Sequence, residues 1–193
     1  MTNNLSERDR LLRLKAIMLY IIQNIRSDKR TVYFIVKAAF LAHRKHMVDY
    51  CVPMLEDTIK ALKFGPVPSD IYDILKIARG EENVYRYHKN AKNLDVILNA
   101  IEFEDEFYSV KENPDLDELS PATIESLDSA IEMANRMSFD EVVKTTHKGE
   151  WYKAFNNPGS HIMDDISIAK EAGISQDGLE YLQYSLELDK LIK

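Results

Sequence analysis

The sequence is short of the features that mark secreted and membrane proteins. It has one cysteine, Cys51, which leaves no partner for an internal disulfide. Its first ten residues, MTNNLSERDR, lack the apolar core of a signal peptide. Its most apolar stretch, TVYFIVKAAFLAH, is interrupted by Lys37 and falls short of the ~20 residues that a membrane-spanning helix needs. We therefore predict a cytoplasmic protein that does not enter a membrane.

Glycine and proline are also scarce, with six residues of each. So few of them, together with 45% hydrophobic residues, argue against long disordered linkers. A chain of 193 residues is long enough for one substantial core. We therefore expect residues 1–193 to form a single domain.

The usual signatures of enzymes and metal sites are missing. The sequence contains no phosphate-binding loop, no Gly-x-Gly-x-x-Gly, no Cys-x-x-Cys and no His-Glu-x-x-His. His43 and His46, with Asp49 or Cys51 nearby, come closest to a metal site. Two histidines three residues apart more often have a structural or surface role. We predict that the protein is not an enzyme and has no cofactor and no metal.

The two signs of charge are unevenly distributed along the chain, whose net charge is −7. Residues 1–100 carry a net charge of +6, and residues 101–141 a net charge of −11. A nucleic-acid surface needs concentrated positive charge, so the pattern disfavours DNA or RNA as a partner. A basic protein partner fits the acidic segment better, although such a run is also typical of a solvated face. Its acidic residues include Glu102, Glu104, Asp105, Glu106, Asp115, Asp117 and Glu118.

Apolar residues repeat at helical spacing over most of the chain. Two signatures mark helix starts: Ser120-Pro121 places a cap before a first-position proline, and Ser138 with Glu141 forms a capping box. Gly149 is predicted to stop the second of these helices. The predicted helices cover residues 7–26, 31–47, 70–79 and 93–101, a long segment after Ser120, a short one from Ser138 to His147, and two segments after the loop at 156–160.

A stiff corner precedes the helix predicted at 70–79. In FGPVPSDIYDILK, Pro66 and Pro68 fix the backbone, and Ser69 is placed to cap the helix. The segment before the corner is ambiguous, and we predict its last part as extended. The residues near 103–111 favour a strand or hairpin that pairs with this extended piece. The predicted fold class is mainly α, with one small antiparallel β element.

The only tryptophan, Trp151, lies four residues after His147, in TTHKGEWYKAF. A lone Trp beside a His more often anchors packing than binds a ligand, so we predict a structural role for this pair. An exposed Trp at a partner interface is the alternative.

Two stretches together resemble the Panacea domain, also called the SocA-like antitoxin domain. FLAHRKHMVDYCVPMLEDTIKALKFGPVPSDIYDILK is similar to the stretch that opens the domain, including its Gly-Pro-Val-Pro corner. PDLDELSPATIESLDSAIEMANRMSFDEVVKTTHKGEWYKAF is similar to its second half. The resemblance spans roughly residues 12–155, which leaves residues 156–193 as a C-terminal helical extension that packs on the domain. One departure is Glu56-Asp57, where the family commonly has Gly-Asp.

The resemblance implies an antitoxin that binds a cognate toxin directly and neutralises it. Some members of the family carry an added DNA-binding domain, and others are adaptors that deliver a toxin to a protease. Two alternatives therefore stay open. One is a winged-helix-like DNA-binding regulator, favoured by the basic first half, and the other is a proteolytic adaptor without a toxin of its own.

The expected partner surface combines the exposed side of the corner with part of the acidic segment. We expect partner-binding residues at Phe64, Pro66, Val67, Pro68, Tyr72, Asp105 and Glu106. A structural role is expected for the remaining motif residues, which are Gly65, Ser120, Ser138, Thr146, His147 and Trp151.

Overall fold

A computed structural model describes residues 7–88 and 93–192 of the chain. It confirms the mainly helical prediction. The helices are α1 (Glu7–Asn24), α2 (Val32–Tyr50), α3 (Ser69–Ala78), α4 (Glu82–Tyr87), α5 (Asp95–Leu98), α6 (Pro121–Arg136), α7 (Phe139–Thr146), α8 (Gly149–Phe155), α9 (Asp165–Ala172) and α10 (Gln176–Ile192), with short 3-10 turns at Ser27–Lys29 and Leu116–Glu118. The strands are β1 (Ile59–Leu62), β2 (Gly65–Pro68), β3 (Ile101–Glu104) and β4 (Phe107–Val110).

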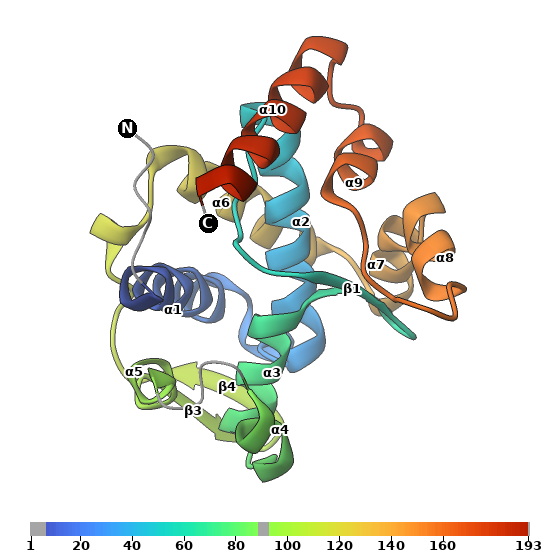
Figure 1. Ribbon diagram of the computed structural model, residues 1–193. Helices are drawn as coiled ribbons and strands as arrows, with labels where there is room; N and C mark the ends of the chain where they lie inside the picture. The colour runs from blue at the N-terminus through green and yellow to red at the C-terminus, as the bar shows by residue number, and fades with distance from the viewer. Residues whose placement is uncertain (1–6, 89–92, 193) are drawn as a thin grey trace.

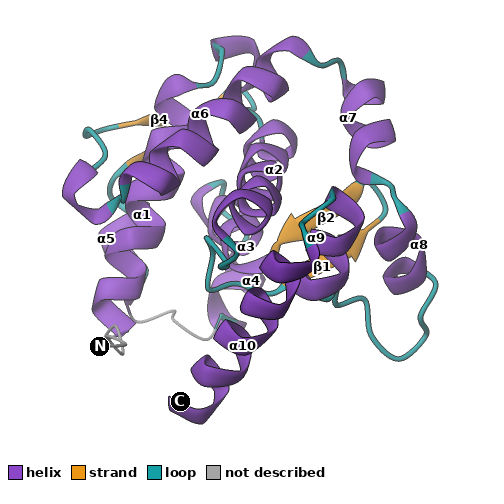
Figure 2. Cartoon of the chain, turned by 90° about the horizontal axis from the view of Figure 1, so that it is seen from above, coloured by secondary structure: helices purple, strands orange, loops and turns teal. Residues whose placement is uncertain are grey.

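Helix α2 runs through the centre of the molecule, with α1, α3, α6, α9 and α10 packed against it (Figures 1 and 2). The sequence accounts for this position because α2 is apolar on nearly all sides, as a buried helix must be. Its residues from Ile35 to His43 are all buried. The predicted range of 31–47 was close, and the helix continues one further turn before Cys51 ends it with a φ of 57°.

The β structure differs from the prediction. We predicted that the residues near 103–111 pair with the extended piece before Pro66, but each segment instead folds back on itself. β1 pairs with β2 and β3 with β4, both antiparallel, giving two separate hairpins. Pairing with the nearest segment along the chain avoids the entropic cost of closing a long loop, which explains the outcome.

Several helix boundaries also need correction. The helix predicted at 93–101 is only the single turn α5, since β3 already begins at Ile101. Gly149 does not stop a helix but begins α8, and neither α8 nor α4 was predicted. The two caps read from the sequence are present: Ser120 accepts a hydrogen bond from the Thr123 N–H, and Ser138 and Glu141 form a reciprocal capping box. The sequence also has a weak capping-box signature at Ser6, with Asp9 three residues later, and Ser6 lies outside the described residues.

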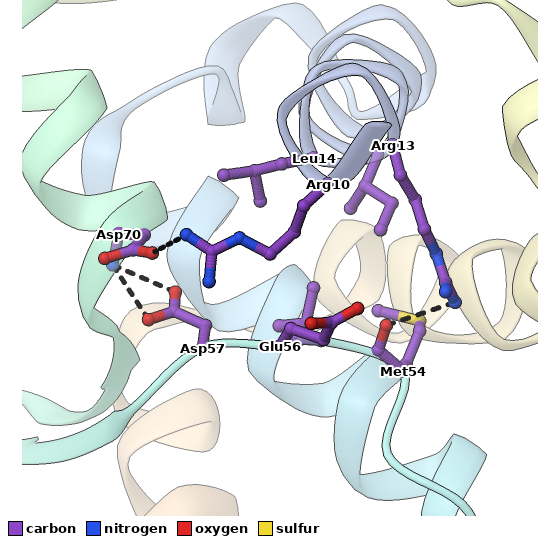
Figure 3. A pocket seen from close by; sticks show the side chains of 9 residues that line it. Arg10, Arg13, Leu14, Met54, Glu56, Asp57 and Asp70 are labelled. Carbon is purple, nitrogen blue, oxygen red and sulfur yellow. Dashed lines mark hydrogen bonds and ion pairs between the residues drawn. The ribbon is translucent and has the colours of Figure 1, made fainter. Parts of the chain in front are cut away.

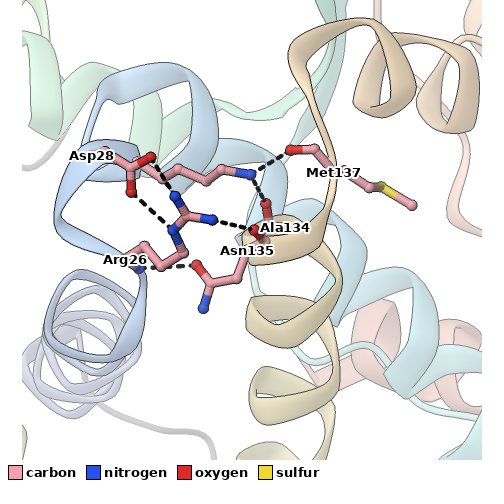
Figure 4. A network of polar contacts seen from close by, with 6 residues as sticks. Arg26, Asp28, Ala134, Asn135 and Met137 are labelled. Atoms are coloured by element: carbon pink, nitrogen blue, oxygen red, sulfur yellow. Dashed lines mark hydrogen bonds and ion pairs between the residues drawn. The ribbon is translucent and has the colours of Figure 1, made fainter.

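The C-terminal end of α6 is tied to the connection between α1 and α2 (Figure 4). The ammonium of Lys29 donates to the Ala134 carbonyl at 2.6 Å and also to the Met137 carbonyl. The backbone N–H of Arg26 donates to the Asn135 side chain at 2.9 Å. A lysine at this end satisfies carbonyls that lack a partner within the helix and complements the helix dipole. Burial lowers the pKa of Lys29.

Candidate functional site

The hairpin formed by β1 and β2, with its turn at Lys63 and Phe64, is held from beneath by side chains of three helices. The indole N–H of Trp151 in α8 donates to the Leu62 carbonyl at 3.0 Å. The Lys37 ammonium in α2 donates to the Pro66 carbonyl at 2.5 Å. His147, at the end of α7, faces the Lys63 carbonyl with its Nε2 at 3.4 Å. We call this unit the corner hairpin.

Gly65 is required where these side chains meet. Its φ of +98° lies in the left-handed region that glycine adopts without strain. A Cβ at this position would lie 2.9 Å from Lys37 Nζ and 3.0 Å from both Thr146 Oγ1 and His147 Cε1. The motif residues Gly65, Thr146, His147 and Trp151 are therefore brought together as one packing unit, although the sequence separates them widely.

Trp151 is buried, with 6% of its surface exposed, and stacks on Phe155 with ring centroids 4.7 Å apart. Its indole also meets the ring of His147 edge-on at a centroid distance of 3.8 Å. Trp151 thus faces the interior beneath the corner hairpin, while His147 is partly exposed.

Lys37 is an unusual component of this support because it is 1% exposed. Its ammonium lies 5.6 Å from the centre of the Tyr33 ring. Removal from water disfavours the charged form, so burial lowers the pKa of Lys37 to about 7.

The edges of the corner hairpin are unsuited to adding a strand from a partner. On the β1 side, the chain at 161–163 already pairs with it: the Ala61 N–H donates to the His161 carbonyl, and the Met163 N–H to the Ile59 carbonyl, both at 2.8 Å. On the β2 side, Pro66 and Pro68 have no N–H to donate. Pairing with a further strand is therefore blocked on the β1 side and hindered by proline on the β2 side.

The start of α3 is capped differently from the prediction (Figure 3). Ser69 is the first residue of the helix, and its hydroxyl donates to the Thr58 carbonyl at 2.8 Å. The cap comes from Asp57, whose carboxylate accepts from the Asp70 N–H at 2.9 Å and from the Ile71 N–H at 3.4 Å. Burial, with the neighbouring Asp70 carboxylate, raises the pKa of Asp57 to about 6. The family commonly has Gly-Asp at positions 56 and 57. Asp57, the residue of that pair that this chain keeps, is thus the one that orients helix α3.

The cavity beside this cap is lined by charged groups of α1 and α3, including Arg10 and Asp70, which lie 3.9 Å apart (Figure 3). Its volume of about 20 Å³ holds a single water molecule and no larger ligand. Its charged side chains therefore connect helices α1 and α3 and do not form a ligand site.

The residues expected to contact a partner at the corner divide into two groups. Pro66, Val67 and Pro68 are buried, and Val67 also lines the groove described below. Phe64 is 54% exposed and Tyr72 is half-buried. The accessible face of the corner is therefore made by aromatic rings, with the prolines behind it.

The structure adds two aromatic residues that the sequence analysis missed. Tyr33 of α2 and Phe139 of α7 lie with ring centroids 4.4 Å apart, and Phe139 also meets Phe64 at 6.0 Å. Phe139 is 43% exposed. One feature of the sequence could have pointed to Phe139. It is an apolar residue directly after the Ser138 cap, on the first turn of α7.

A groove of about 410 Å³ opens beside these rings. Its walls come from the first turns of α2, with Tyr33 and Val36, from the corner hairpin, with Phe64 and Val67, and from Tyr72 of α3. We call it the corner groove. Its size is in the range of ligand-binding sites, and three of the expected corner residues, Phe64, Val67 and Tyr72, line it together with Tyr33.

The second expected feature, at Asp105 and Glu106, is the exposed turn between β3 and β4, here called the acidic hairpin. The two turn residues have φ values of 49° and 71°, the arrangement of a tight type I′ turn. The hairpin is attached through Tyr108, whose hydroxyl donates to the Leu75 carbonyl of α3 at 2.7 Å. Glu102, Glu104, Asp105 and Glu106 are all exposed.

The two histidines considered for a metal site have other roles. His43 accepts from the Leu55 N–H at 3.2 Å and approaches Asp165 on its other side, also at 3.2 Å. His46 is hydrogen-bonded to Ser126 at 3.0 Å, and burial lowers its pKa to about 4. Within residues 7–88 and 93–192, no three His, Cys, Asp or Glu side chains gather in a way that could hold a metal ion. In the same part of the chain, no helix is both long and apolar enough to cross a membrane.

Comparison with known families finds one match. The family described as antitoxin SocA-like, Panacea domain, matches residues 35–152, which is more than half of the chain. The match runs from α2 to α8 and includes the corner hairpin, the acidic hairpin and the side chains that support the corner. Comparisons with curated proteins and with solved structures found no match.

Proposed function

The chain belongs to the SocA-like Panacea domain family, and from this membership we propose that it neutralises a toxin protein by binding it directly, without a catalytic step of its own. The observation that carries the proposal is the rigid support of an exposed aromatic face. Trp151, Lys37 and Gly65 hold the corner hairpin from within, while Phe64 and its neighbours face solvent. Such a surface loses little conformational entropy when a partner binds.

Aromatic residues also suit the task, because exposed Tyr and Phe side chains supply large contact areas at the centre of protein interfaces. Tyr33, Phe64 and Phe139 form one contiguous group from three elements. A single exposed ring is common on protein surfaces and does not indicate an interface. A contiguous group of three rings can supply the apolar core of one.

The acidic hairpin supplies the second part of the proposed surface. Its carboxylates complement a basic patch on the toxin and accelerate the encounter at low salt. Helix α3 contacts both hairpins, so the aromatic and acidic parts are joined by one structural element.

A DNA-binding role finds less support in this geometry. A winged-helix protein would present the hairpin formed by β3 and β4 to the phosphate backbone. That hairpin carries four exposed carboxylates, at Glu102, Glu104, Asp105 and Glu106, which repel phosphate.

The test uses the chain together with the toxin encoded beside it. We expect Asp105→Lys with Glu106→Lys to weaken the complex and slow its association at low salt, while the melting temperature stays near that of the wild type. A matched control reverses two exposed carboxylates of α10, Glu187→Lys with Asp189→Lys, and should leave binding unchanged. Growth rescue and binding kinetics provide the readouts.

Equal loss in both double variants would mean that bulk charge, and not the acidic hairpin, governs association. Unaltered neutralisation in both would remove the acidic hairpin from the interface. Measuring the toxin level during rescue also separates two mechanisms, because blocking leaves the toxin intact and delivery to a protease depletes it.

A further inference from the structure

The corner groove has a charge opposite to that of the whole chain. The chain has a net charge of −7, yet the residues that line the groove include two lysines, Lys37 and Lys63, and no Asp or Glu. Charge complementarity therefore favours an occupant with negative charge.

The walls of the groove are largely apolar and aromatic. The rings of Tyr33, Phe64 and Tyr72 line it together with Val36 and Val67. A space of about 410 Å³ takes one large side chain with part of its backbone, but not a folded element. Aromatic walls favour an aromatic occupant, because offset and edge-to-face ring contacts add to the burial of apolar area.

The two lysines differ in how they are placed. Lys63 is exposed at the rim, where its ammonium lies 5.3 Å from the centre of the Phe64 ring. Lys37 is at the floor and already donates to the Pro66 carbonyl. Lys63 is therefore the lysine that an incoming anion reaches, while Lys37, whose pKa burial lowers to about 7, adds only part of a positive charge at neutral pH.

The Tyr33 wall of the groove has a carboxylate in its neighbourhood. Asp140 lies close enough to Tyr33 to contribute, after burial, to raising the pKa of that hydroxyl to about 12. An anionic occupant is therefore favoured near Lys63 and disfavoured near Tyr33.

We propose that the corner groove receives a segment of the partner protein that presents an aromatic side chain beside a carboxylate, with the ring between Tyr33, Phe64 and Tyr72 and the carboxylate at Lys63. This inference rests on the proposed function, because it describes how the same surface recognises its partner. A basic patch on the toxin would meet the acidic hairpin and an aromatic residue with a neighbouring carboxylate would enter the groove. Two contacts of opposite charge fix the orientation of the bound toxin.

The test needs no toxin. The full chain, with isotope-labelled valine methyl groups, is titrated separately with N-acetylphenylalanine, which carries a carboxylate, and with its neutral amide. We expect saturable shifts of the Val36 and Val67 methyl signals, and binding of the carboxylate probe about two- to fivefold tighter than that of the amide, as one exposed ion pair allows.

Two variants test the role assigned to Lys63. Lys63→Glu should abolish or reverse the preference for the carboxylate probe, and Lys63→Gln should bring the two probes to equal affinity. Lys170→Glu, the same charge change on exposed α9, should preserve the preference. A thermal melt of each variant verifies that the fold is retained, which is expected because Lys63 is an exposed turn residue.

The inference is overturned if the probes bind equally to the wild type, if the shifts map outside the groove, or if Lys63→Glu keeps the preference. These results would leave the neutralisation proposal standing, because that proposal is tested with the toxin and the acidic hairpin. Conversely, the chain could bind the carboxylate probe preferentially but fail to neutralise the toxin encoded beside it. That result would contradict the proposed function and leave the inference about the groove standing.

Discussion

The corner hairpin and the acidic hairpin share a local structure but differ in what holds them. Each has two four-residue strands and a two-residue turn, and each exposes a phenylalanine near the tip, Phe64 at 54% and Phe107 at 41%. The corner hairpin is supported by hydrogen bonds from Trp151 and Lys37 in distant helices. The acidic hairpin has a type I′ turn of its own, and Tyr108 attaches it by donating from its hydroxyl to the Leu75 carbonyl and from its backbone N–H to the Arg30 carbonyl.

This difference separates two ways of presenting a binding surface. A hairpin that is fixed by tertiary contacts keeps its rings in place, which suits recognition by shape. A charged hairpin acts over a longer range and tolerates local motion, which suits steering of the partner. The substitutions below test whether the corner depends on distant side chains and whether the acidic hairpin depends on its turn.

The largest effect is expected from Trp151→Ala. The change removes a buried ring together with the donor to the Leu62 carbonyl, and it should lower the free energy of unfolding by ~3–5 kcal/mol. Chemical denaturation measures the loss. Tyr152→Ala is the matched control, because Tyr152 is the next residue and is 56% exposed, so it should change stability far less. Equal effects of the two would show that the corner is not supported by Trp151.

Gly65→Ala should have the next largest effect, about 2–4 kcal/mol, from backbone strain and from the clash with Lys37 and Thr146. Gly80→Ala separates the two causes. Gly80 has nearly the same φ, +97°, but nothing lies within 4 Å of its missing Cβ, so only the strain of ~1–2 kcal/mol should remain. If both variants lose the same stability, close packing beneath Gly65 contributes nothing.

The third prediction concerns pH. The pKa of Lys37 is about 7 in the folded chain and near 10.4 when unfolded, so the unfolded state binds more protons between these values. Stability should therefore rise by roughly 1–2 kcal/mol from pH 7 to pH 9. Lys37→Met should reduce this rise of stability with pH.

Denaturation at the two pH values measures the slope, and Lys60→Met, at an exposed position on β1, is the control. Asp57 and His46 titrate below this window, at about 6 and about 4. A Lys37→Met variant with the wild-type slope would contradict the assignment to Lys37.

The smallest effect is expected in the acidic hairpin. Glu106 has a φ of 71°, which glycine adopts without strain, and Asp-Gly is a favoured pair for a type I′ turn. Glu106→Gly should therefore raise stability by ~0.5–1 kcal/mol. A thermal melt detects the change, and Glu104→Gly, placed within strand β3, should instead destabilise the hairpin. Stabilisation by both variants would mean that charge relief, and not turn geometry, is responsible.

Much of the corner was predictable from the sequence, but its supports were not. The run from Phe64 to Pro68 carries its own conformational restrictions, so its bend and the helix after it were expected. The cap of that helix was misassigned, because Asp57 reaches the Asp70 N–H across a separation of thirteen residues. No local pattern marks such a contact.

The sequence by itself determined the features that arise within one or two helical turns. The buried character of α2, the cap at Ser120 and the capping box of Ser138 and Glu141 depend on residues three or four positions apart, so their spacing is visible in the chain. The tertiary structure alone decided that each hairpin pairs with itself, that α2, α7 and α8 converge beneath Gly65, and that a groove lined by lysines and aromatic rings opens beside Phe64. The physical reason is that these contacts join residues tens of positions apart, and which of them form depends on how the whole core packs.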